Sequence, residues 1–127
     1  MTTLRIGIRT YQEAREQMLA IARGEAKADP NAPQVWVTSL ASLAQILNDE
    51  NRALLRLIGE RNPVSLTNLA ALSGRSVPSL SRTLATLESY GLVEMVEHGR
   101  AKAPRLAATR IEIVLSDLGP ETVMAAE

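Results

Sequence analysis

The spacing of hydrophobic residues along the chain predicts short strands that alternate with amphipathic helices. Apolar and polar residues alternate over residues 4–8, which is the period of a strand. A helix should follow over about residues 11–23, because Thr10 and Glu13 have the spacing of a capping box. Gly24 is placed to end this helix. At helical spacing, one face carries the side chains Tyr11, Ala14, Met18, Ile21 and Ala22.

The next segment predicts a second short strand and two further helices. The strand falls on residues 35–37, and a helix should follow over about residues 39–47, with the serine at its start as the cap. Asp49 is the expected N-cap of another helix, over about residues 50–60. The same pattern also fits one bent helix. The Asn-Pro pair at residues 62–63 ends the segment in either case.

The following stretch has the clearest helix signals in the chain. Ser65 can cap a short helix, and Gly74 lies in the tight turn after it. Ser76 then caps a longer helix, which Gly91 is placed to end. The buried stripe of this longer helix is expected to be Val77, Leu80, Leu84 and Leu87.

Beyond that helix the hydrophobic pattern changes to strict alternation, which predicts strands. A strand over residues 92–97, a turn over residues 98–102 and a return strand over residues 104–107 would form a hairpin. Pro104 is expected to limit strand pairing there. Residues 110–115 alternate cleanly and predict a last strand.

This order of short helix, glycine turn, longer helix and hairpin resembles the winged helix-turn-helix of regulators of the MarR and ArsR type. In those proteins the recognition helix has the form Ser-x-x-Ser-Leu/Val-Ser-Arg-x-Leu-x-x-Leu-Glu and runs into Gly-Leu-Val. The matching residues here are Ser76, Ser79, Leu80, Ser81, Arg82, Leu84, Leu87, Glu88, Gly91, Leu92 and Val93. The resemblance implies a DNA-binding regulator. We expect an α+β, mostly helical fold, with a winged helix-turn-helix and an N-terminal strand-helix-strand extension.

The upstream part is similar to a family of small prokaryotic predicted regulators with the same extension, some of which look like antitoxins. The expected organisation is an extension at residues 1–48, a DNA-binding domain at residues 49–115 and an acidic, loosely held tail at residues 116–127. One winged helix reads few base pairs, so a homodimer on a palindromic site is expected. The extension is the candidate dimerisation region, and the strand at residues 110–115 is a candidate to join it.

The polar face of the longer helix and the hairpin carry the candidate DNA contacts. With the leucine stripe inside, one arginine and several hydroxyl side chains should lie on the opposite side, where the arginine can donate to guanine N7 and O6. The helix N-terminus can receive a phosphate, and basic residues around the hairpin turn can contact the DNA backbone or the minor groove. The candidate set is Arg75, Ser76, Ser79, Arg82, Thr83, Thr86, Arg100, Lys102 and Arg105.

Simpler structural roles exist for several of these residues. Ser76 is first of all a helix cap, Arg82 could be a solvated surface arginine, and the hairpin cations could be ordinary turn charge. Trp36 is expected in the core or in a dimer interface rather than in a ligand site.

The net charge of zero, with 14 basic and 14 acidic residues, argues at first against nucleic acid as a partner. The sum conceals a division along the chain. Residues 62–110 hold 6 basic and 3 acidic groups, whereas residues 111–127 hold 4 acidic groups and no basic one. The negative charge of residues 111–127 offsets the positive charge of residues 62–110 in the sum, so a neutral total is compatible with DNA binding by one basic face. The neutral total still predicts weak non-specific affinity.

Composition excludes several other function classes. The chain has no cysteine and one histidine, His98, so a metal site, a cysteine nucleophile and a catalytic triad are not expected. It also has no glycine-rich phosphate loop and too few aromatic residues to stack single-stranded nucleic acid. We expect neither enzyme activity nor a cofactor. No run of residues is apolar enough to span a membrane, and no signal peptide is evident, so the expected location is the cytoplasm.

The expected function is sequence-specific binding of double-stranded DNA by a dimeric regulator, in the simplest case an autorepressor. An alternative is an antitoxin that binds and neutralises a toxin protein while regulating its own operon. A ligand-responsive sensor and a winged helix used only for protein contacts are two further alternatives. The last of these predicts no DNA binding even at low salt.

Overall fold

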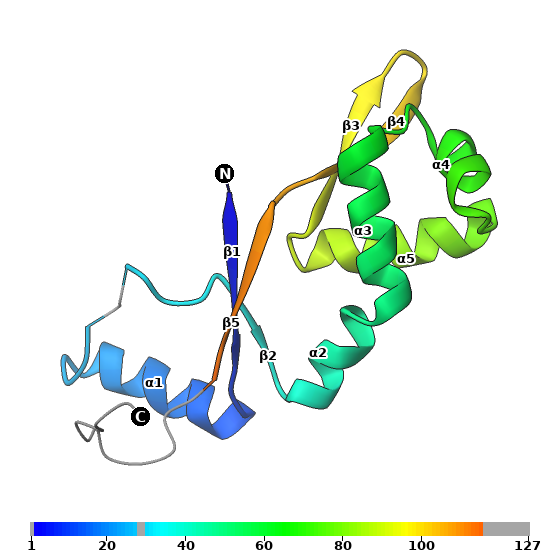
Figure 1. Ribbon diagram of the computed structural model, residues 1–127. Helices are drawn as coiled ribbons and strands as arrows, with labels where there is room; N and C mark the ends of the chain where they lie inside the picture. Colours follow the sequence, from blue (N-terminus) through cyan, green and yellow to red (C-terminus); the bar gives the residue numbers. More distant parts are fainter. Residues whose placement is uncertain (1, 28–29, 116–127) are drawn as a thin grey trace, which may run out of the picture.

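The computed structural model describes residues 2–27 and 30–115, and the acidic tail expected at residues 116–127 lies outside this range. Within the described residues the fold is α+β, with five helices and five strands. The elements form two groups: a three-stranded sheet with one helix beside it, and four helices with a two-stranded hairpin (Figure 1). No helix in the described part of the chain has the length and apolar character needed to cross a membrane.

The three-stranded sheet joins both ends of the described chain. Its central strand β1 (Thr3–Ile8) pairs in parallel with β2 (Val35–Val37) on one side and with β5 (Arg110–Val114) on the other. Alternation along β1 places Leu4 and Ile6 in the core. The sequence predicts all three strands, and β5 joins the N-terminal strands within one chain.

On the face of the sheet away from the core, Gly7 leaves room for the side chain of Trp36. The indole of Trp36 lies across this glycine, and a Cβ at position 7 would come within 2.4 Å of the ring. Arg9 Cζ lies 3.9 Å from the centroid of the same ring. The indole is nevertheless 38% exposed, so Trp36 is a surface residue held in place by its neighbours.

Helix α1 (Tyr11–Ala22) begins where the capping box predicts. Thr10 Oγ1 accepts a hydrogen bond from the backbone N–H of Glu13, and Glu13 Oε1 accepts one from the N–H of Thr10. Gly24 follows the helix in the left-handed conformation, with φ of 75°. None of the residues of α1 is fully buried, and Ala14 alone of its predicted apolar face is half-buried, so most of this face stays exposed within the described chain.

Helices α2 (Leu40–Ile46) and α3 (Asp49–Arg61) are separate helices, not one bent helix. The N-cap of α3 is Asn48, so the prediction of Asp49 as the cap is wrong by one residue. Asn48 is favoured because it serves both helices. Its Oδ1 accepts from the N–H of Asn51 at 2.8 Å, and its Nδ2 donates to the carbonyl of Gln45 at 3.0 Å.

Helices α4 (Leu66–Ser73) and α5 (Val77–Ser89) form with α3 the larger part of the core. Ser65 and Ser76 cap them, as predicted, by accepting N–H bonds from the first turn. The prediction that Val77 is buried with the leucine stripe is wrong: it is the first residue of α5 and is 38% exposed. The buried leucines and isoleucine that meet here are Leu54, Ile58, Leu69, Leu80, Leu84 and Leu87.

The hairpin consists of β3 (Val93–His98) and β4 (Ala101–Leu106). Its turn is shorter than predicted, because Gly99 takes φ of 63° and allows the strands to pair up to His98 and Ala101. Pro104 does not interrupt the pairing and lies opposite Met95. Within the described residues β4 pairs with β3 alone, and an edge strand can accommodate a residue that lacks an N–H.

Candidate nucleic-acid interface

The turn between α4 and α5 sets the start of the candidate recognition helix. Gly74 follows α4 with φ of 76°, in the left-handed conformation. Ser76 Oγ accepts a hydrogen bond from the N–H of Ser79 at 3.2 Å, and Pro78 occupies the first turn of α5. The capping role of Ser76 is therefore present, and the hydroxyl is already used in the free protein. A phosphate at this terminus would contact the remaining free N–H groups.

The exposed side of α5 carries Arg82 and Thr86. The hydroxyl of Thr86 donates to the backbone carbonyl of Arg82 at 3.2 Å. The guanidinium of Arg82 makes no hydrogen bond or ion pair with any described residue. A free guanidinium on a helix surface keeps its planar set of donors available for a ligand.

Ser79 and Thr83 are half-buried rather than freely exposed as predicted, although Ser79 lies on the same side of α5 as the exposed Thr86, seven residues later. Both hydroxyls are held by Arg75, whose Nη2 donates to Thr83 Oγ1 at 2.7 Å and contacts Ser79 Oγ at 3.4 Å. The predicted exposure fails for these two residues because the Arg75 side chain covers them. Of the four residues predicted on this side, Arg82 and Thr86 are exposed.

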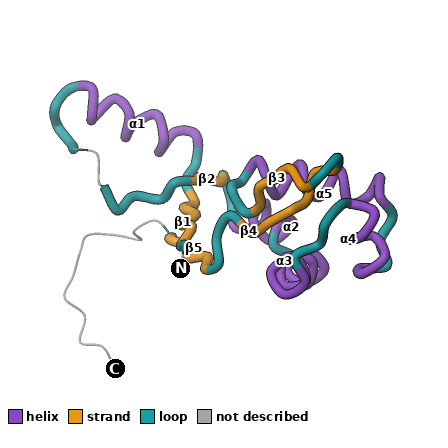
Figure 2. Tube along the Cα trace, turned by 90° about the horizontal axis from the view of Figure 1, so that it is seen from above, coloured by secondary structure: helices purple, strands orange, loops and turns teal. Residues whose placement is uncertain are grey.

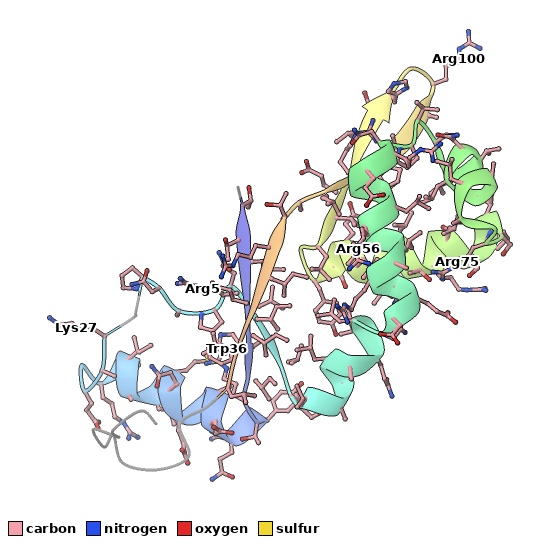
Figure 3. All side chains as sticks on the ribbon, viewed as in Figure 1. Arg5, Lys27, Trp36, Arg56, Arg75 and Arg100 are labelled. Carbon is pink, nitrogen blue, oxygen red and sulfur yellow. The ribbon has the colours of Figure 1, made fainter. Side chains whose placement is uncertain are left out.

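Arg75 also contacts a third helix, α3, and the sequence does not indicate this contact. Its Nη1 lies 3.5 Å from Asn51 Oδ1 in the first turn of α3. The Nδ2 of Asn51 in turn donates to the carbonyl of Ile46 at the end of α2. Arg75 also lines a cavity of about 480 Å³ between α3 and α4, whose walls include Leu54 and Leu72. Figure 3 shows Arg75 beside the N-terminal part of α5.

The three basic residues predicted around the hairpin turn have different environments. Arg100 projects from the tip, and Lys102 is exposed on β4 (Figure 3). Arg105 points back into the protein, where its Nη1 donates to the carbonyls of Pro63 at 2.6 Å and Pro104 at 2.8 Å. Two of the three cations are therefore available to a partner, and Arg105 attaches the hairpin to the end of α3.

Carboxylates moderate the charge of the hairpin. Glu97 lies directly across the ladder from Lys102, and Glu94 lies across from Arg105. Among the candidate DNA contacts, the exposed cations are therefore Arg82 on α5 and Arg100 and Lys102 on the hairpin. The described residues contain no group of three His, Asp or Glu side chains that could hold a metal ion.

Comparison with known proteins gives one match. The sequence model of the HVO_A0114 family matches residues 46–113, more than half of the 127-residue chain. This stretch includes α3, α4, α5, the hairpin and most of β5, and therefore contains every candidate DNA-contact residue. No curated protein and no solved structure matches the chain.

Proposed function

The chain belongs to the HVO_A0114 family, and we propose that it is a sequence-specific regulator that binds double-stranded DNA through a winged helix-turn-helix. The observation that carries this proposal is the unpaired guanidinium of Arg82 on the exposed side of a capped helix, next to a hairpin with a basic tip. In this proposal α4 and α5 form the helix-turn-helix and β3 and β4 form the wing. The resemblance to regulators of the MarR and ArsR type supports the same assignment.

The proposed binding mode follows from the exposed groups. α5 lies in the major groove, where Arg82 donates to guanine N7 and O6 and Thr86 contacts a neighbouring base edge. Arg100 and Lys102 contact the flanking phosphates, and these contacts set the orientation of the protein without reading sequence. Arg75 holds Thr83 and Ser79 and thereby supports the surface of α5 from one side. Repression of the protein's own operon is the simplest role for such a regulator.

The proposal is tested by fluorescence anisotropy with the DNA upstream of the protein's own gene and with random DNA. Replacing Arg82→Ala should cost about 1–3 kcal/mol on the cognate site and much less on random DNA, because base contacts are lost and phosphate contacts remain. Arg56→Ala is the matched control, since it removes the same charge from an exposed position on α3. Equal losses of binding free energy on both DNAs would show that Arg82 contacts only phosphates. Absence of DNA binding by the wild-type protein at low salt would refute the proposed DNA-binding function.

A further inference from the structure

Helix α1 carries a hydrophobic seam that the described part of the chain leaves largely uncovered, with only Ala14 of its members half-buried. Tyr11, Ala14, Met18 and Ile21 follow one another at intervals of three, four and three residues, which is the a and d spacing of a coiled coil. Tyr11 is 85% exposed and Met18 is 68% exposed. Ile21 is 40% exposed. This spacing on an exposed face allows the seam to pack against another helix.

The position of α1 in the molecule explains why no other described helix supplies such a partner. The helix lies beside the end of the sheet, away from α2, α3, α4 and α5 (Figures 1 and 2). None of its residues is buried. An isolated helix of 12 residues is at best marginally stable in water, so the capping box alone does not account for an ordered α1. A docked partner would supply the missing stabilisation.

We propose that α1 pairs antiparallel with α1 of a second copy of the chain. The seam is complementary to itself in this arrangement: Met18 fits against Ala14 of the partner copy, and Tyr11 fits against its Ile21. Each layer then combines a larger with a smaller side chain, as close packing requires. In a parallel pair Ala14 would face its own counterpart and leave a void, which is destabilising. A two-fold axis crossing the helices at right angles generates the antiparallel pair.

The neighbouring end of the sheet can enlarge this interface. Because β1 and β5 are parallel with Gly7 opposite Val114, the C-terminal end of β5 lies where the chain leaves β1 for α1. Val114, on the same face as Gly7, and Leu115 are exposed there. A buried aliphatic side chain removes about 60–120 Å² from water. These residues and the α1 seam could bury on the order of 500 Å² per copy, and the resulting total of about 1,000 Å² reaches the lower bound for a specific interface.

Sedimentation equilibrium of the full chain without DNA tests the proposal, which does not depend on the proposed DNA-binding function. The wild-type protein should be a dimer at micromolar concentration. Met18→Glu should raise the dimer dissociation constant by about tenfold or more, because it places a carboxylate in each copy of the seam. Leu19→Glu is the matched control: it puts the same charge on the adjacent exposed residue, outside the seam, and should leave the dimer intact. A monomeric wild-type protein, or equal effects of the two variants, would overturn the interface.

The antiparallel geometry has its own test, because the chain contains no cysteine. A mixture of Ala14→Cys and Met18→Cys proteins should form a disulfide between the two variants under mild oxidation. Either variant alone should cross-link much more slowly, since like positions are offset along the antiparallel helices. Rapid cross-linking of Ala14→Cys with itself would instead indicate a parallel pair and would overturn this geometry. Circular dichroism shows whether each variant keeps its helices.

Discussion

At the scale of single residues, Arg75 has a role that its place in the sequence does not reveal. The sequence indicates only a cation between a glycine turn and a helix cap, and proposes it as a DNA contact. In the structure its guanidinium binds hydroxyls on α5 and reaches Asn51 on α3, 24 residues earlier. The sequence locates the helix start correctly from local capping signals. It cannot show that Thr83 lies under Arg75, because that depends on how α3 packs against α5.

A substitution of Thr83 tests this role of Arg75. Thr83→Val should lower the free energy of unfolding by about 1 kcal/mol, because the half-buried guanidinium loses its shortest hydrogen bond. Thr86→Val is the matched control, since Thr86 is exposed and bonds only to a backbone carbonyl of its own helix. Urea denaturation of the two variants measures the difference. Losses of the same size in both would show that the Arg75 contact does not stabilise the fold.

At the scale of elements, helices are predicted more accurately than the hairpin. The bounds of α4 and α5 follow from serine caps and left-handed glycines, which act within a few residues. The hairpin turn was expected over five residues, but β4 already begins at Ala101. Strand ends depend on which residues pair across the ladder, and pairing is not encoded in the alternation of one strand. For the same reason Arg105, expected among the exposed cations, turns inward to Pro63.

The hairpin tip makes a distinct prediction for DNA binding. Replacing Arg100 and Lys102 together with alanine should weaken binding to cognate and random DNA alike, because phosphate contacts carry no sequence information. The slope of log affinity against log salt should fall by up to about two. Anisotropy titrations at several salt concentrations measure both effects. Arg23→Ala with Lys27→Ala is the control: it removes two exposed cations beside α1, far from the hairpin (Figure 3). A similar loss in that control would indicate general electrostatic attraction.

At the scale of the whole molecule, β5 returns the end of the described chain to the N-terminal sheet. Arg5 Nε donates to Glu112 Oε1 at 3.0 Å, although the two residues are 107 positions apart. Arg110 Nε lies 3.4 Å from the other carboxylate oxygen, Glu112 Oε2. The sheet therefore combines the extension at residues 1–48 with the last strand of the segment proposed to bind DNA.

The ion pair between β1 and β5 predicts a pH dependence of stability. The hydrogen bond from Arg5 lowers the pKa of Glu112 below its usual value. Desolvation raises this pKa, and the positive charges of Arg5 and Arg110 lower it further. A carboxyl with a lowered folded-state pKa stabilises the protein above its unfolded-state pKa, and this contribution disappears as the pH falls through the folded-state value. Glu112→Gln should therefore lower Tm near neutral pH and have less effect in acid.

Thermal unfolding of wild type and Glu112→Gln from about pH 7 down to about pH 3 measures this difference. Glu97→Gln, on the exposed part of the hairpin, is the control for removing one carboxylate. The Tm difference between wild type and Glu112→Gln should shrink as the pH falls, whereas the control should show no such trend. A difference that stays constant with pH would exclude the ion pair as its source.

The sequence by itself determined the order and type of the elements, the caps of α1, α4 and α5, and the leucine stripe of α5. These features depend on interactions between residues a few positions apart, which leave a pattern in the chain. Only the tertiary structure decided that Arg75 covers Ser79 and Thr83, that Arg105 turns inward, that β5 pairs with β1 and that α1 remains largely uncovered within the described chain. The last three outcomes depend on contacts, or on missing contacts, between segments far apart in the sequence. The Arg75 contacts span only four and eight residues, but they depend on the path of the turn between α4 and α5, which no local period records.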